Sequence, residues 1–207
     1  MQGSTSPSIA AELLTEIEEL SQTCERHVRD ALGIGLDGEI ETLPILDHYI
    51  TVSRDAVRQR PELLPLLSRT IGAYFGRVLA RHFEGFWWLT SEDVHTWFVC
   101  MQNVYLALNP VGLVHAALAP DEVEAMSGPP ADLRLAREDR ELVELRLAAL
   151  PPVAEADFRR LSVRVEGLEV AVAALREQMI EGGMGDVSFE PRDYDDELAA
   201  PPAQLLN

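Results

Sequence analysis

The sequence FRRLSVRVEGLEVAVAALREQM, residues 158–179, decides the architecture of the C-terminal part of the chain. Its apolar residues alternate at spacings of three and four, which places them along one face of an α-helix. Valine at a positions and leucine at d positions of this repeat favour a parallel two-stranded coiled coil. We call this apolar face the seam, and it consists of Phe158, Leu161, Val165, Leu168, Val172, Leu175 and Met179. The pattern predicts that the protein self-associates through the seam as a homo-oligomer.

Two other interpretations of the seam are open. The peptides LSVRV and LEVAV alternate apolar and polar residues on either side of Glu166-Gly167, as the strands of a β-hairpin would. Good helix formers on both sides and a stop at Gly182-Gly183 favour the helix instead. Residues 131–149 also have a helical pattern, which Pro151-Pro152 must end. The two helices can therefore close on each other within one chain, as an intramolecular helical hairpin.

The composition predicts a globular protein without a membrane span. With 207 residues, 47% of them hydrophobic, the chain is long enough for one domain of ordinary size with appendages. The N-terminal peptide MQGSTSPSIA lacks the basic and apolar regions of a signal peptide. Residues 97–119 carry no formal charge, but Gln102 and Asn103 would be costly in hydrocarbon. We expect a cytoplasmic location, which the isolated cysteines Cys24 and Cys100 also favour.

The charged residues exclude several classes of function. A net charge of −18 repels phosphate groups, which argues against nucleic acids and anionic membranes as partners and leaves basic proteins open. All 17 basic residues are arginine, so the chain contains no lysine. Schiff-base chemistry, a pyridoxal phosphate anchor, a Walker A loop and a protein kinase lysine are therefore excluded.

Local patterns predict a mostly helical N-terminal region with a small antiparallel sheet. Amphipathic periodicity and helix-start residues predict helices over residues 7–32, 41–57, 61–83 and 111–119. Aromatic and β-branched residues predict strands over residues 86–89, 97–101 and 104–108.

These elements predict an α+β fold in three parts. Residues 1–125 form the globular domain, and a proline-rich linker leads to the helical pair with its coiled-coil seam, residues 131–181. Residues 182–207 carry many acidic and few apolar residues, which predicts an acidic disordered tail.

One part of the sequence resembles a known class of domain. The run from LDHYI to LLSRTIGAYFGRVLARHFEGFWW is similar to small bacterial α+β domains of unknown function, in which a G-x-Y-hydrophobic-G helix precedes a tryptophan-bearing strand. The matching positions are Gly72, Tyr74, Phe75, Gly76 and Trp87 or Trp88. Arg77 stands where such domains are expected to have an acidic residue. The resemblance covers about a third of the chain and implies a fold without a reaction.

Few residues have the spacing of a metal or catalytic site. Cys24 and His27 lie three apart on a predicted helix, as two zinc ligands can, but no second pair with ligand spacing follows. We therefore expect no metal and no cofactor. His82, Glu84 and His95 bracket the first predicted strand and are the candidates for acid and base catalysis.

The pair Asp47-His48 resembles part of a catalytic triad. No serine or cysteine lies in the sharp strand-to-helix turn that a nucleophile requires. Adjacent residues on a helix also point in different directions, so Asp47 and His48 cannot orient each other.

The aromatic residues around the first strand are the candidate partner-binding surface. Trp87 and Trp88 are consecutive, so their side chains must point to opposite faces of a strand. If one ring lies in the core, the other is either covered by a helix or exposed to a partner. We assign Tyr74, Trp87 and Trp88 to this surface.

The sequence favours a non-enzymatic bacterial cytoplasmic adaptor that binds a protein partner and self-associates through its C-terminal helices. One alternative is a small hydrolase or ligand-binding enzyme with its pocket near His82, Glu84 and His95. The other is an acidic, immunity-like protein that neutralises a basic partner, which the net charge also fits.

Overall fold

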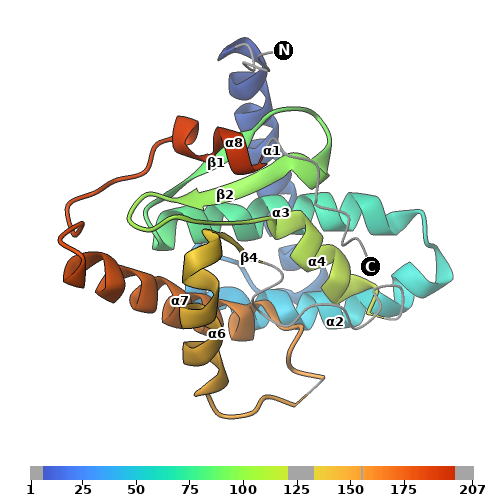
Figure 1. The fold of residues 1–207 in the computed structure, drawn as a ribbon. Coiled ribbons are helices and arrows are strands. Elements are labelled where there is room, and N and C mark those ends of the chain that lie inside the picture. Colours follow the sequence, from blue (N-terminus) through green and yellow to red (C-terminus); the bar gives the residue numbers. More distant parts are fainter. Residues whose placement is uncertain (1–6, 121–132, 155, 199–207) are drawn as a thin grey trace, which may run out of the picture.

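Helices α1, α2 and α3 form the N-terminal part of the fold (Figure 1). The computed structural model describes residues 7–120, 133–154 and 156–198. The bounds of the helices are α1 (Pro7–Leu32), α2 (Leu43–Gln59) and α3 (Leu63–His82). Each helix buries an apolar stripe with helical spacing, as α1 does with Ile17, Cys24 and Val28. Gly33 follows α1 with a φ of +70°, a conformation that glycine adopts without strain.

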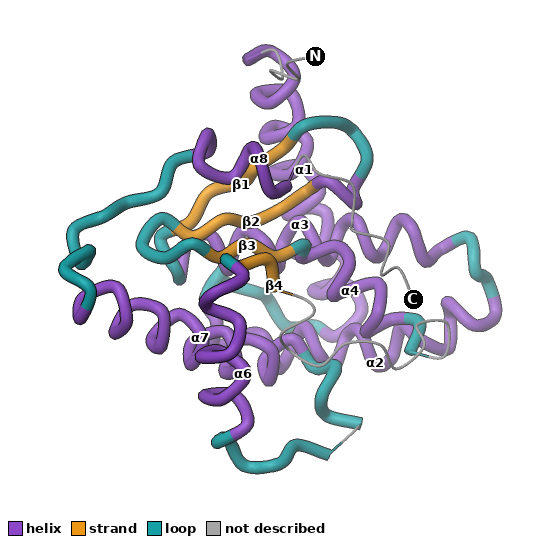
Figure 2. The backbone as a smooth tube through the Cα atoms, in the orientation of Figure 1, coloured by secondary structure: helices purple, strands orange, loops and turns teal. Residues whose placement is uncertain are grey.

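A small antiparallel sheet follows α3 (Figure 2). Its strands in the described residues are, in spatial order, β1 (Gly85–Leu89), β2 (Trp97–Met101), β3 (Leu106–Leu108) and β4 (Leu133–Leu135). The first three correspond to predicted strands, but β4 corrects the prediction of a helix from residue 131. Leu133 and Leu135 are buried while Arg134 is exposed, and β4 pairs with β3. The helix of this region, α6 (Arg140–Ala148), begins after β4.

The sheet separates two apolar layers. Trp97 of β2 contacts the core residues of α1 and α3, and Val99 belongs to the main core with α2, α3 and α4 (Pro110–Leu118). Phe98 and Cys100 alternate with them and face the opposite layer. Both faces of the sheet are therefore covered by the chain's own segments.

Two glycines bring α3 close to its neighbours. A Cβ atom on Gly72 would lie 2.7 Å from the Cα atom of Val111 in α4. A Cβ atom on Gly76 would overlap the ring of Trp87 in β1. The four-residue spacing of these glycines thus fits α4 and β1 against the same helix.

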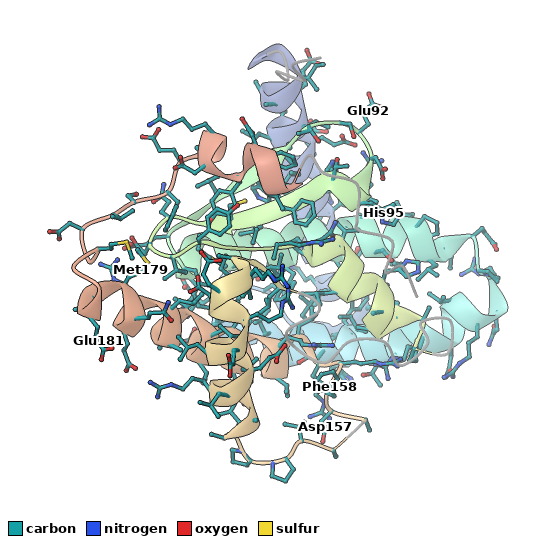
Figure 3. The ribbon with its side chains drawn as sticks, in the orientation of Figure 1. Glu92, His95, Asp157, Phe158, Met179 and Glu181 are labelled. Carbon is teal, nitrogen blue, oxygen red and sulfur yellow. The ribbon has the colours of Figure 1, made fainter. Side chains whose placement is uncertain are left out.

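Helix α7 (Leu161–Glu181) directs the seam into the core of its own chain. Leu161, Leu168 and Leu175 are at most 5% exposed and belong to the cluster that includes α2, α3 and the sheet. Phe158 lies on the loop before α7, at the opposite end of this region from Met179 (Figure 3). The helical prediction is confirmed, and intramolecular packing, which the sequence left open, accounts for the burial. A partner helix would find the seam already covered.

The boundary predicted at residue 125 does not divide the core. Leu135 and Leu168 from the C-terminal part share one hydrophobic cluster with Ile71 and Leu106. The architecture is α+β, mostly helical with a small antiparallel sheet, as predicted. Along the described segments, no helix combines the length and the apolar character that crossing a membrane requires.

Asp47 of α2 caps the first turn of α7. Its Oδ1 atom accepts a hydrogen bond from the backbone N–H of Leu161 at 2.7 Å. Its Oδ2 atom accepts from the hydroxyl group of Ser162 at 2.6 Å and from the Ser162 backbone N–H at 3.2 Å. Arg160, the residue before α7, makes no side-chain cap of its own. The backbone N–H groups of the first turn of a helix have no acceptor within the helix, and Asp47 supplies acceptors from α2. Its negative charge also interacts favourably with the positive N-terminal end of the α7 dipole.

Residues 187–198, which we call the C-terminal strap, cover the outer face of the sheet (Figure 1). They include a 3-10 turn (Pro191–Tyr194) and the short helix α8 (Asp195–Leu198). Tyr194 is 1% exposed, and its hydroxyl group lies 2.8 Å from the Met101 carbonyl oxygen and accepts from the Leu106 N–H at 3.1 Å. The indole N–H of Trp88 donates to Asp195 at 3.0 Å.

The strap corrects the prediction of a disordered tail over residues 187–198. Negative charge alone does not prevent docking when one aromatic ring, Tyr194, is buried and stacks on Tyr105 with ring centroids 4.6 Å apart. Residues 199–207 lie outside the described residues.

We expect the substitution Asp47→Ala to lower the free energy of unfolding by about 2–3 kcal/mol, because the cap is lost and a buried N–H group is left without a partner. Urea denaturation followed by circular dichroism measures the change. Asp55→Ala is the matched control, because Asp55 lies on the same helix with its side chain 77% exposed. Equal losses in the two variants would contradict the capping role.

We expect a chain that ends at residue 186 to lose stability relative to one that ends at residue 198, since burial of Tyr194 alone contributes about 3–5 kcal/mol. The thermal midpoint should fall, and Cys100, buried beneath the strap, should react with a thiol reagent. Cys24, buried in α1, is the internal control and should stay protected. Identical midpoints with an unreactive Cys100 would show that the strap is dispensable.

Candidate functional site

The structure does not bring the predicted acid and base residues together. His82 ends α3, and its Nε2 atom lies 3.0 Å from the Glu169 carboxylate of α7. Glu84 lies in the turn before β1 with a φ of 52° and accepts a hydrogen bond from the Asn103 side chain at 2.8 Å. His95 follows β1, at the other end of a strand that spans about 17 Å, and Figure 3 shows it near Glu92.

The two other polar candidates also have structural roles. Burial raises the pKa of the Cys24 thiol to about 12, so the sulfur stays protonated at neutral pH and is a poor metal ligand. Among the described residues, no three potential ligands gather around one point, near His27 or elsewhere. Asp47 uses its carboxylate to cap α7, whereas its neighbour His48 is exposed.

The three predicted partner-binding aromatics are covered by the chain itself. Tyr74 is fully buried, and its hydroxyl group accepts a hydrogen bond from the Gly38 N–H at 2.9 Å. Trp88 is 5% exposed beneath the strap. Trp87 is half-buried and lines a small groove of about 350 Å³ between α1, α3 and β1. These positions support the fold, and only Trp87 keeps an accessible edge among the three.

Arg77, the position that departs from the resembling domains, joins α3 to α1. Its guanidinium group binds the carboxylates of Glu18 and Glu25 and lies 5.3 Å from the centre of the Tyr74 ring. An acidic residue at this position would repel both glutamates.

A further candidate site is a cavity of about 780 Å³ between α6, α7 and the loop that connects them. Its floor belongs to the main core and is formed by Phe75, Leu108, Leu113 and Leu133. Leu147 and Ala148 form the α6 wall, and Val163, Gly167 and Leu168 form the α7 wall. The connecting loop adds Leu150, Pro151, Pro152 and Val153. Figure 1 shows α6 crossing α7 above this loop.

Gly167 widens the space between the two helices. A Cβ atom at this position would meet only Leu147, at an ordinary contact distance of 3.7 Å. The glycine thus costs helix stability and leaves an open volume next to Leu147.

The rim of the cavity combines apolar and charged groups. Leu150 and Val153 are 39% and 46% exposed, although both are large apolar residues. Glu144 and Glu166 also line the cavity, and within the described part of the chain neither carboxylate forms an ion pair or a hydrogen bond. Arg164 lies over the Phe158 ring with its guanidinium carbon 4.1 Å from the ring centre.

The cavity has the size and the lining of a ligand-binding site. The volume falls within the range of about 300–1,000 Å³ that ligand sites occupy, and the walls are mostly apolar with a few polar groups at the mouth. No motif in the sequence marks this site, since its walls come from separate segments. The one available hint was the run LPPV, residues 150–153, which places apolar residues outside any helical or strand pattern.

Comparison with known proteins adds no assignment, because no protein family, curated protein or solved structure matches the chain. The resemblance of the Gly72–Gly76 segment to bacterial α+β domains stays an interpretation of the sequence.

A matched pair of glycine substitutions tests the close approach at Gly76 and the open space beside Gly167. Gly76→Ala should lower the free energy of unfolding by about 1–3 kcal/mol, because the methyl group displaces the Trp87 ring. Gly167→Ala should raise it by about 0.5–1 kcal/mol, because alanine favours the helix and the cavity has room for the methyl group. Urea denaturation of both variants gives the comparison. A loss in Gly167→Ala would show that the space beside Leu147 is smaller than described.

Proposed function

We propose that this protein is a non-enzymatic cytoplasmic adaptor that binds a protein partner at the cavity between α6 and α7. The observation that carries the proposal is an apolar cavity of about 780 Å³ that reaches from the surface to Phe75 and Leu108 in the core. Apolar volume that no side chain fills lowers the stability of a protein. An apolar cavity that opens to the surface is therefore suited to take up the apolar groups of a ligand.

The surface around the cavity favours a protein as the ligand. Leu145 of α6 is 68% exposed and lies one helical turn from Ala148 on the cavity wall. Together with Leu150 and Val153, it extends the apolar surface beyond the mouth. Contiguous exposed apolar residues with a polar rim are a feature of protein interfaces.

The cytoplasmic location is part of the proposal. Cys24 lies in α1 and Cys100 in β2, in separate hydrophobic clusters. Burial raises the pKa of both thiols, so they are unreactive, as structural cysteines of a reducing compartment are. Self-association through the seam is left out of the proposal, because Leu161, Leu168 and Leu175 are covered within one chain.

Site-specific photocrosslinking tests the proposal. A photoreactive phenylalanine analogue at Val153, on the rim, should form a crosslink to a specific protein in the cells that express the chain. The matched control is Val52, which is 47% exposed against 46% for Val153 and belongs to α2, none of whose residues lines the cavity. We expect a discrete crosslinked band from position 153 that is absent from position 52.

Competition ties the crosslink to the cavity. The substitution Ala148→Trp places an indole group at the α6 wall and should abolish the crosslink from position 153 while circular dichroism stays unchanged. No crosslink at 153, or equal bands at 153 and 52, would overturn the proposal.

A further inference from the structure

The charges at the cavity identify the kind of segment it accepts, an inference that rests on the proposed function. Glu144 projects from α6 and Glu166 from α7, so the mouth has a carboxylate on each helical wall. Both side chains are exposed, and no described residue neutralises either of them. Glu141, one turn before Glu144, is also exposed.

The nearby cations offset only part of this negative charge. Arg164 also lines the cavity and keeps its positive charge while its guanidinium carbon lies 4.1 Å from the centre of the Phe158 ring, so one cation stands against the three carboxylates of Glu141, Glu144 and Glu166. Arg146 of α6 is directed to Glu177 of α7, with 2.9 Å between Nη2 and Oε2. The mouth therefore keeps the negative sign of the whole chain, whose net charge is −18.

This charge argues against a second copy of the chain as the occupant. Two copies related by a twofold axis would bring identical acidic rims together, and like charges across an interface oppose association. A partner with positive charge gains attraction from the same field, in both its rate of encounter and its orientation.

We propose that the cavity binds a cationic amphipathic segment of a partner protein. Apolar side chains of the segment enter between Leu147 and Gly167, and flanking lysine or arginine side chains pair with Glu144 and Glu166. The apolar side chains of the segment fill the cavity, and its positive charges pair with the carboxylates at the mouth.

Peptide binding by the full-length protein tests this inference. The probe is a fluorescein-labelled helical peptide of about 18 residues with a leucine stripe and lysines elsewhere. Its matched peptides have glutamate in place of lysine, or serine in place of leucine. Fluorescence anisotropy at low salt should show binding of the leucine–lysine peptide that is at least about tenfold tighter than that of either matched peptide.

Charge reversal locates the binding. Glu144→Arg with Glu166→Arg should weaken the leucine–lysine peptide by about tenfold, because two attractions become repulsions. Glu92→Arg with Asp30→Arg makes the same change in net charge at exposed positions on other elements, and should change affinity by less than about twofold. The filling variant Ala148→Trp should weaken the peptide without any change of charge.

Three results would overturn the inference. The first is binding of the leucine–glutamate peptide as tight as that of the leucine–lysine peptide. The second is equal weakening by the distant double variant and the rim variant, and the third is unchanged binding in Ala148→Trp. A crosslink from position 153 together with failure of the peptide would refute the cationic segment and keep the adaptor proposal. Light scattering that shows a dimer dissociated by Ala148→Trp would identify a second copy as the occupant instead.

Discussion

The hydrogen bonds between Asp47 and the first turn of α7 are the contact on which the rest of the structure depends. A buried carboxylate is costly unless its oxygens are satisfied, and here three donors from Leu161 and Ser162 satisfy them. The contact fixes where α7 begins and how it is rotated against α2. That rotation directs the seam inward and leaves the face with Val163 and Gly167 toward α6. The burial of the seam and the cavity beside α7 therefore both depend on this capped helix end.

Much of the fold could be predicted from local patterns, because α1, α2 and the first three strands have the periodicity of their structure within a few residues. Three features depended on distant contacts instead. The strand β4 is too short to be recognised from its own sequence. It is defined by its pairing with β3, in which Leu135 lies opposite Leu106. The seam indicated an apolar face, but periodicity does not say whether the same chain or another covers it. The acidic composition of the C-terminal strap predicted disorder, but burial of one residue, Tyr194, is enough to dock the strap on the sheet.

The candidate site was harder to predict than the fold. The sequence pointed to His82, Glu84 and His95 because histidine and glutamate are common catalytic residues. In the structure, however, His82 and Glu84 lie at one end of strand β1 and His95 lies at the other end. The cavity consists of aliphatic side chains, which are indistinguishable in sequence from core residues. What separates the two groups is the open space beside Gly167 and the end of α6 at Ala148, before Pro151-Pro152. The open space is a property of three-dimensional packing. Sequence patterns record which residues are apolar and not which ones lack neighbours.

The position of the strap has a consequence for biosynthesis. Phe98 and Cys100 belong to an apolar sheet face that only residues far along the chain can cover, with Tyr194 bonded to Leu106 across 88 positions and Asp195 to Trp88 across 107. On a ribosome, the sheet strands emerge long before their cover does. Contacts between residues so far apart in sequence form slowly, and an apolar sheet face that is exposed in the meantime is prone to aggregation. During synthesis, the exposed sheet face of the nascent chain is therefore a surface to which a chaperone would bind until the strap covers it.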